Sequence, residues 1–391
     1  MNFQLVTTKE EEQFREEVSD FLKKELTYEL QRQHAMDMGL KKEGREFAKK
    51  LGQKKWLGIN WPEKYGGAGL PMIYEFILIQ ELARHEAHIP TEIACFMGGP
   101  LILRHGSEAM KEEFVPRIAK GEMEFGLGYS EPQAGSDLMA MQMTAVEDGE
   151  YFIINGQKTF NTESHYADYH WLAAKTDSQA PRHKSISLFI VDQRAPGITI
   201  RPIETLGGEQ SNEVFYDDVM VPKSRVVGEK NKGFLYMVEA LNYERLALYQ
   251  NERLKPVLAR LVEYSKTKRR NGKLLAEDSY VRQMLAQMEM EIEVALSLEY
   301  RAIAMLLGGD PPDYEAGLVK LFGSELRQRV GYKAMDILGL FGLLEEGSEG
   351  EVFRGEVARL CRSGIVDTIG GGTSEIIRNI TAMRGLGLGR K

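Results

Sequence analysis

The sequence is poor in the features that mark disulfide-rich, membrane-spanning and nucleic-acid-binding proteins. Its 391 residues include two cysteines, Cys95 and Cys361, which support neither a disulfide framework nor a cysteine-based metal site and fit a reducing compartment. No apolar run reaches the ~18 residues that a membrane helix requires. Basic residues are not in excess, because there are 50 Lys and Arg and 58 Asp and Glu, and this balance argues against nucleic acid as the main partner.

The N-terminus shows no targeting signal. Residues 1–14 contain Lys9 and several glutamates but no apolar stretch, so they do not read as a secretory signal, and they are too acidic for a transit peptide. We therefore expect a cytoplasmic protein without a membrane span.

The chain divides into three segments with different hydrophobic periods. Helical spacing dominates residues 1–121, β-type runs bounded by Gly, Pro, Asp and Asn occupy residues 122–227, and helical spacing returns over residues 228–391. The helical stripes are Phe14, Val18, Phe21 and Leu22 in the first segment and Leu285, Met288, Ile292 and Ala295 in the third. The sequence predicts an α+β protein with an N-terminal helical domain, a middle β domain and a C-terminal helical bundle.

A polar segment that contains glycine, Tyr129–Asp137, begins the β-rich part of the chain. The hydroxyls of Ser130 and Ser136 and the backbone N–H groups near Gly135 are hydrogen-bond donors that add no charge. Such donors suit the carbonyl oxygens of a bound ligand. The same residues also suit an ordinary polar turn.

A second segment, Asn155–Phe160 followed by Thr162, supplies an aromatic ring and a hydroxyl. An aromatic face packs well on a planar ring system, and a hydroxyl donates to a ring nitrogen. Taken alone, the segment equally suits a hairpin turn at Asn155–Gly156 and a core position for Phe160.

Together these segments resemble the acyl-CoA dehydrogenase family, and the resemblance runs from Trp61–Gly67 to the C-terminus. It implies a flavoprotein that binds FAD and an acyl-CoA thioester, with Ser136 near both. The family's usual Ile between the aromatic residue and the Thr is Asn161 here. The FAD contacts implied in this part of the chain are Leu127, Ser130, Ser136, Phe160 and Thr162.

Two later segments match FAD-binding patterns of the family with substitutions. In Lys266–Lys273, Lys268 takes the place of an Arg and Asn271 that of a Phe. Lys268 keeps the positive charge, but it lacks the guanidinium group that can bind a phosphate through two parallel hydrogen bonds. Arg269 or Arg270 fills the Arg place after a shift of one residue, and the plain alternative is a solvated basic surface.

The second of these segments is Asp336–Gly342. Asp336 takes the place of a Gln, Gly339 keeps the first glycine, and Leu340 replaces the second. Because a carboxylate repels a pyrophosphate, we expect Asp336 to bind a hydroxyl or a backbone N–H.

The implied reaction needs a carboxylate that removes the α-proton of the thioester. In many family members this acid lies in a C-terminal Tyr-Glu-Gly-Thr loop, which here reads Gly370–Thr373 and has Gly371 in the place of the acid. A second family arrangement carries the base on a helix before an Arg, and Glu244 fits it. Glu244 also falls in the gap of a stripe of apolar residues, which places its carboxyl group on an otherwise apolar face of the helix. Desolvation on such a face raises the pKa of a carboxyl group. That stripe consists of Phe234, Met237, Leu241 and Leu248.

Glu244 is therefore the predicted base. The plain alternative is a surface glutamate with an i, i+4 partner. If Glu244 is not the base, Glu92 in the helical N-terminal segment is the next candidate.

The resemblance also implies contacts around the base. Tyr243 and Arg245 become substrate contacts, with Arg245 on the CoA side, and Gly371 donates its backbone N–H to the thioester carbonyl. Thr373 and Glu375 follow as further FAD contacts. Because three glycines replace an acid-bearing loop, we expect space for a branched, cyclic or bulky acyl group.

The resemblance to the family implies a homotetramer, built as a dimer of dimers, that passes electrons to an electron-transfer flavoprotein. Two alternatives use the same scaffold, a flavin oxidase or monooxygenase and an enoyl-CoA reductase. A third is a non-catalytic subunit of a heteromeric flavoprotein, which the substitutions at Lys268 and Asp336 motivate.

Overall fold

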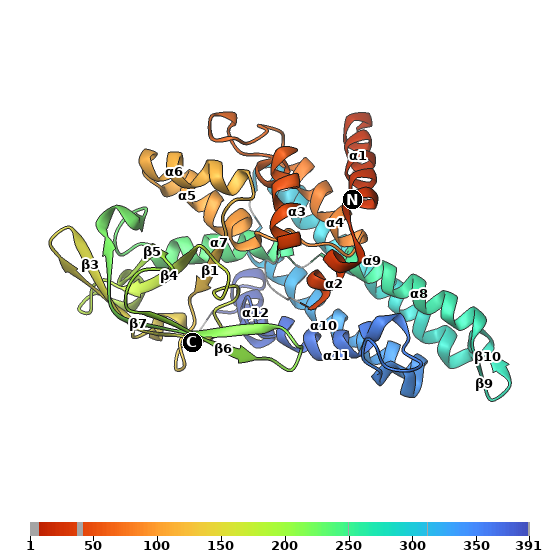
Figure 1. Ribbon diagram of the computed structural model, residues 1–391. Coiled ribbons are helices and arrows are strands. Elements are labelled where there is room, and N and C mark those ends of the chain that lie inside the picture. Colours follow the sequence, from red (N-terminus) through yellow and green to blue (C-terminus); the bar gives the residue numbers. More distant parts are fainter. Residues whose placement is uncertain (1–7, 37–41, 249, 311, 390–391) are drawn as a thin grey trace.

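The chain folds into a helical domain, a β domain and a second helical domain, in that order (Figure 1). The computed structural model describes residues 8–36, 42–248, 250–310 and 312–389. This arrangement confirms the predicted α+β architecture.

Six α-helices build the N-terminal domain within the residues that the structure describes. The first is fixed by a capping box, because the Thr8 hydroxyl accepts from the Glu11 N–H at 3.2 Å and the Glu11 carboxylate accepts from the Thr8 N–H at 2.9 Å. Val18 and Leu22 are fully buried on this helix, which confirms the apolar stripe. The helices are α1 (Lys9–Glu25), α2 (Tyr28–Met36), α3 (Lys42–Gln53), α4 (Ile73–Arg84), α5 (Gly99–His105) and α6 (Glu108–Ala119).

The middle domain is an eight-stranded mixed sheet. Its order is β6-β7-β3-β2-β4-β5-β8, and β1 pairs with β4 in parallel. Strands β4 and β5 are buried along most of their length, so they form the core of this domain. The strands are β1 (Phe125–Gly128), β2 (Thr144–Asp148), β3 (Tyr151–Lys158), β4 (Tyr169–Lys175), β5 (Ile186–Asp192), β6 (Ile198–Glu204), β7 (Gln210–Pro222) and β8 (Val226–Val227).

The pair Asn155–Gly156 does not form a hairpin turn. It lies inside β3, where the register against β7 shifts between Ile154 and Gly156. Gly156 has φ = 144°, and a Cβ there would come within 3.0 Å of Met143, so the bulge needs glycine.

Helices return at Gly233, and the long α9 and α10 pack together to form the core of the C-terminal domain. Met288, Ile292 and Ala295 are buried on α9, as the stripe predicted. A small hairpin interrupts the helices where the sequence predicted none. The elements are α7 (Gly233–Leu248), α8 (Leu254–Thr267), β9 (Arg269–Arg270), β10 (Lys273–Leu274), α9 (Ser279–Leu307), α10 (Tyr314–Leu338), α11 (Glu356–Asp367) and α12 (Ser374–Ile380).

Two kinds of feature are absent from the part of the chain that the structure describes. None of its helices combines the length and the apolar character that crossing a membrane would need. No group of His, Cys, Asp and Glu side chains in it is placed to hold a metal ion.

Candidate active site

The two polar segments predicted from the sequence lie side by side in the β domain. The Leu127 N–H donates to the Thr162 carbonyl at 3.2 Å, and the Thr159 N–H donates to the Ser130 carbonyl at 3.0 Å. These backbone bonds hold Leu127, Ser130 and Thr162 in one place. The structure thus brings together residues that are up to 35 positions apart in the chain.

A buried ion pair fixes this arrangement. Lys158 Nζ lies 2.9 Å from Glu131 Oε1 and donates to the Tyr129 carbonyl at 3.0 Å. Glu131 also accepts from the backbone N–H groups of Gln142 and Met143. Burial lowers the pKa of Lys158 to about 8, although Glu131 opposes this shift. The pair ties the polar turn to strand β3.

Three of the residues expected to meet the flavin are exposed. Phe160 is 66% exposed, which excludes the core position considered for it, and its φ of 55° is unusual for a residue with a side chain. Thr162 and Ser136 are also exposed, and a Cβ built at Gly135 meets no atom within 4 Å. Strained backbone is common at ligand sites. An open face with an aromatic ring and hydroxyls fits a planar flavin.

Helix α7 carries three of the predicted residues, Tyr243, Glu244 and Arg245. The side chain of Glu244 lies outside the described residues. The Tyr243 hydroxyl donates to Glu75 on α4, and Asn60 Nδ2 donates to the same carboxyl oxygen at 2.9 Å. Burial raises the pKa of Glu75 to about 7, although both hydrogen bonds oppose this. Tyr243 is thereby held against the N-terminal domain.

Arg245 connects the same helix to the C-terminal glycine loop. Its Nε and Nη2 lie 3.2 and 3.1 Å from the Gly371 carbonyl oxygen, and its Nη1 donates to Asn242 at 2.9 Å. Arg245 is only 7% exposed. Lys320 Nζ donates to the next carbonyl, that of Gly372, at 2.6 Å. Two of the predicted substrate residues, Arg245 and Gly371, are therefore in direct contact.

The glycine loop has a backbone that side chains disfavour. Gly371 has φ = 63° and Gly372 has φ = 104°. A Cβ at Gly372 would also lie 3.4 Å from Arg245 Nη2. Glycine is needed here to bring the loop against α7.

Thr373 and Glu375 lie at the start of α12. The Thr373 hydroxyl caps this helix by accepting from the Ile376 N–H at 3.2 Å. Both residues line an open pocket that also contains Arg329 and Arg378. Cations and a helix N-terminus suit an anionic group, as a pyrophosphate would supply.

The remaining predicted FAD residues form a second group. Arg270, on β9, donates to the Asp336 carbonyl at 3.2 Å and also to the carbonyl of Ile337, so the hairpin lies against the end of α10. Lys268 and Asp336 are exposed, Gly339 has φ = 61°, and Leu340 is 82% exposed. Figure 1 shows β9 and β10 at the opposite end of the molecule from the β domain.

Several residues that stabilise the site were not predicted from the sequence. Glu131 and Lys158 lie within the two polar segments, but nothing in the sequence indicates that they form an ion pair. Glu75 was detectable in principle, because it is the only charged residue in the apolar run Ile73–Ile79. Arg270, which the sequence offered as an alternative to Lys268, contacts the Asp336 segment.

Comparison with known proteins gives matches over the whole chain. The N-terminal, middle and C-terminal domains of acyl-CoA dehydrogenase match residues 8–122, 126–219 and 231–386. The acyl-CoA dehydrogenase FadE26 of Mycobacterium tuberculosis is 35% identical over 353 residues, which cover 88% of each chain.

Solved structures agree with this match. The structure described as the Tcur3481-Tcur3483 steroid ACAD has a TM-score of 0.92 at 33% identity and covers 100% of both chains. The ChsE4-ChsE5 complex from Mycobacterium tuberculosis has a TM-score of 0.90 at 33% identity and covers 99% of this chain and 100% of that one. The chain belongs to the acyl-CoA dehydrogenase family and is an FAD-dependent oxidoreductase.

Proposed function

We propose that the chain dehydrogenates a bulky acyl-CoA thioester at its α and β carbons, with Glu244 as the base. The observation that carries the proposal is the pair of contacts on either side of position 244. Tyr243 bonds to Glu75 of α4, and Arg245 bonds to Gly371 of the C-terminal loop. Position 244 therefore belongs to a helix segment fixed against both the N-terminal domain and the glycine loop.

The residues divide the chemical work between them. Bound FAD supplies the acceptor for the hydride that leaves the β-carbon. Glu244 takes the α-proton, and the Gly371 N–H donates to the thioester carbonyl, which stabilises the enolate-like charge. Arg245 keeps the Gly371 backbone in place by holding its carbonyl. Ser130, Phe160 and Thr162 provide the face on which the flavin ring packs.

A bulky substrate is proposed on two grounds. Gly370, Gly371 and Gly372 carry no side chain next to the base helix. The structural relative with the TM-score of 0.92 is described as a steroid ACAD. Both favour a ring-bearing or branched acyl group over a short straight one.

The test is flavin bleaching by a panel of acyl-CoA thioesters under anaerobic conditions. We expect bulky thioesters to reduce the flavin at least tenfold faster than short straight-chain ones. Equal rates would contradict the proposed substrate class. Rapid reoxidation of the reduced flavin by air would favour an oxidase or monooxygenase, and slow reoxidation with transfer to an electron-transfer flavoprotein would favour the dehydrogenase.

We also propose that a second chain completes each FAD site. The Lys268–Arg270 and Asp336–Leu340 segments lie together but far from the β-domain face that carries Phe160 and Thr162. A heteromeric partner is one form of this, because one structural relative is described as a complex of two named chains. If the chain purified alone is yellow and bleached by a thioester, the non-catalytic subunit alternative fails.

A further inference from the structure

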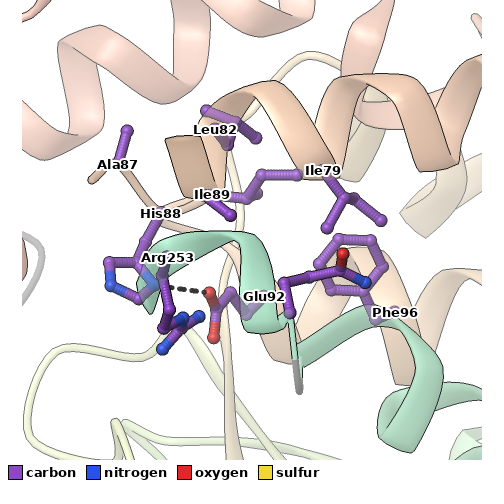
Figure 2. A pocket seen from close by; sticks show the side chains of 10 residues that line it. Ile79, Leu82, Ala87, His88, Ile89, Glu92, Phe96 and Arg253 are labelled. Carbon is purple, nitrogen blue, oxygen red and sulfur yellow. Dashed lines mark hydrogen bonds and ion pairs between the residues drawn. The ribbon is translucent and has the colours of Figure 1, made fainter. Parts of the chain in front are cut away.

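Two pockets meet the turn that follows α4. Figure 2 shows the smaller one, where His88 Nδ1 lies 3.3 Å from Glu92 Oε1. Its volume of about 20 Å³ holds about one water molecule, so it is too small for an organic ligand. The larger one has a volume of about 350 Å³, within the range of small-molecule sites. This interdomain pocket is bounded by α2, the turn after α4, α8 and the start of α11.

Charged side chains dominate the lining of the interdomain pocket. Its arginines outnumber its glutamates, so the lining is positive overall. The arginines are Arg32, Arg260, Arg354 and Arg359, and the glutamates are Glu86, Glu346 and Glu356.

Two of the glutamates are bound to one arginine. Arg260 on α8 donates to Glu86 at 2.9 Å and to Glu356 on α11 at 2.6 Å. Burial raises the pKa of Glu356 to about 7, and the neighbouring Glu86 adds to this rise although Arg260 opposes it. Arg260 Nε is also buried and has no hydrogen-bond partner among the residues that the structure describes. The two glutamates therefore add little free negative charge to the pocket near neutral pH.

The other side of the pocket leaves two guanidinium groups without an anion. Glu346 accepts from two side chains of α2, the Tyr28 hydroxyl and Arg32 Nε. Arg354 lies over the Tyr28 ring, 4.2 Å from its centroid, and Arg359 Nη1 donates to the Arg354 carbonyl at 2.8 Å. Neither Arg354 nor Arg359 forms an ion pair within the described ranges of the chain. Each guanidinium has five N–H donors, so most of these donors are open to a ligand.

The backbone that carries Arg354 is strained. Phe353 and Arg354 both have φ = 54°, and Glu86 on the opposite wall has φ = 55°. Residues with side chains disfavour this region, and such strain is common at ligand sites.

We propose that the interdomain pocket binds an anion of the phosphate class, held chiefly by Arg354 and Arg359. A guanidinium binds phosphate oxygens through two parallel hydrogen bonds, and the three acceptor oxygens of a phosphate can use donors from more than one arginine. The site lies outside the candidate active site and does not depend on the proposed function. Because the pocket joins α2 of the N-terminal domain to α11 of the C-terminal domain, a bound phosphate should also stabilise the folded protein.

The test is calorimetric titration of the FAD-loaded protein at constant ionic strength with inorganic phosphate, ribose 5-phosphate and acetate. We expect saturable binding of both phosphates and binding of acetate that is weaker by about tenfold or more, since acetate offers fewer acceptor oxygens. Tighter binding of ribose 5-phosphate would identify the ligand as a phosphorylated organic molecule, and equal or weaker binding would identify it as the free ion. Inorganic phosphate should also raise the melting temperature until the site is saturated.

The double variant Arg354→Met/Arg359→Met locates the binding. It should raise the Kd for phosphate by about tenfold or more and abolish the thermal shift, whereas Arg359→Lys, which keeps the charge, should have a smaller effect than Arg359→Met. Arg194→Met/Arg201→Met removes two exposed arginines from the β domain and is the matched control, which should keep the wild-type Kd.

Three results would overturn the inference. They are the absence of saturable phosphate binding, equal affinity for acetate, and a wild-type Kd in the folded double variant, with folding checked by circular dichroism. Because the readout is binding and not turnover, failure of the Glu244 assignment would leave this test unaffected.

Discussion

At the scale of single residues, the buried Glu75, which is bonded to Tyr243 of α7, makes the stability of the fold depend on pH. Its folded-state pKa of about 7 lies above the ordinary 4.5, so the folded protein keeps a proton that the unfolded chain releases. The stability contributed by this proton is complete below pH 4.5 and is lost as the pH rises through 7.

Glu75→Gln should remove this loss, because glutamine keeps the shape and does not titrate. We expect the melting temperature of the variant, relative to wild type, to increase between pH 4.5 and pH 7 and to level off above it. Thermal melts across this pH range measure the difference. A constant difference would mean that Glu75 does not titrate there.

The buried pair of Lys158 and Glu131 makes a second prediction at this scale. Both side chains are almost fully buried, at 0% and 2% exposure. Lys158→Met leaves the Glu131 charge without its partner, which destabilises by about 3–5 kcal/mol. Urea unfolding monitors the loss, and FAD content should fall with it, since the pair positions Ser130. Lys230→Met, at an exposed pair with Glu147, is the control and should cost less than about 1 kcal/mol.

At the scale of elements, the contact between α7 and the glycine loop should affect catalysis more than folding. Arg245→Lys keeps the charge but loses the fork that makes two bonds to the Gly371 carbonyl. We expect kcat to fall by about 10- to 100-fold with FAD retained, because the loop N–H is no longer held in place. Steady-state kinetics and flavin absorbance separate the two effects. An unchanged kcat would show that Arg245 does not position the loop.

The elements also show what the sequence predicted and what it left open. The spacing of apolar residues along the chain located the three domains, because this spacing shows which face of a helix or strand is buried. Val18 and Ile292, both predicted on apolar stripes, are fully buried. The family resemblance implied that Leu127, Ser130, Phe160 and Thr162 contact the flavin, and backbone bonds join Leu127 to Thr162 and Ser130 to Thr159. The Glu75–Tyr243 bond and the β9–β10 hairpin were not predicted, because they depend on tertiary contacts between distant segments. The alternatives of a hairpin at Asn155 and a buried Phe160 were wrong.

At the scale of the whole molecule, we propose that the second group of predicted FAD residues reaches a flavin only in an assembly with a partner chain. Its end carries exposed apolar residues, with Leu340 at 82% and Phe341 at 53% exposure. Such residues are typical of surfaces that are covered on assembly.

Leu340→Asp should therefore weaken assembly and lower the FAD content together. Light scattering coupled to size exclusion measures the mass, and absorbance measures the flavin. Val146→Asp, at another exposed apolar residue on β2, is the control and should change neither. A variant of Leu340 with wild-type mass and flavin would contradict the role of this end in the cofactor site.

The central claim is that Glu244 removes the α-proton, and Glu244→Gln tests it most directly. The variant should bind FAD and acyl-CoA as the wild type does, while anaerobic flavin bleaching slows by at least about 1,000-fold, within the range expected for loss of a general base. Glu239→Gln, on the same helix but paired with Arg104 and His105, should bleach normally. Wild-type bleaching by Glu244→Gln would contradict the account and move the base to another acid, with Glu92 the first to examine.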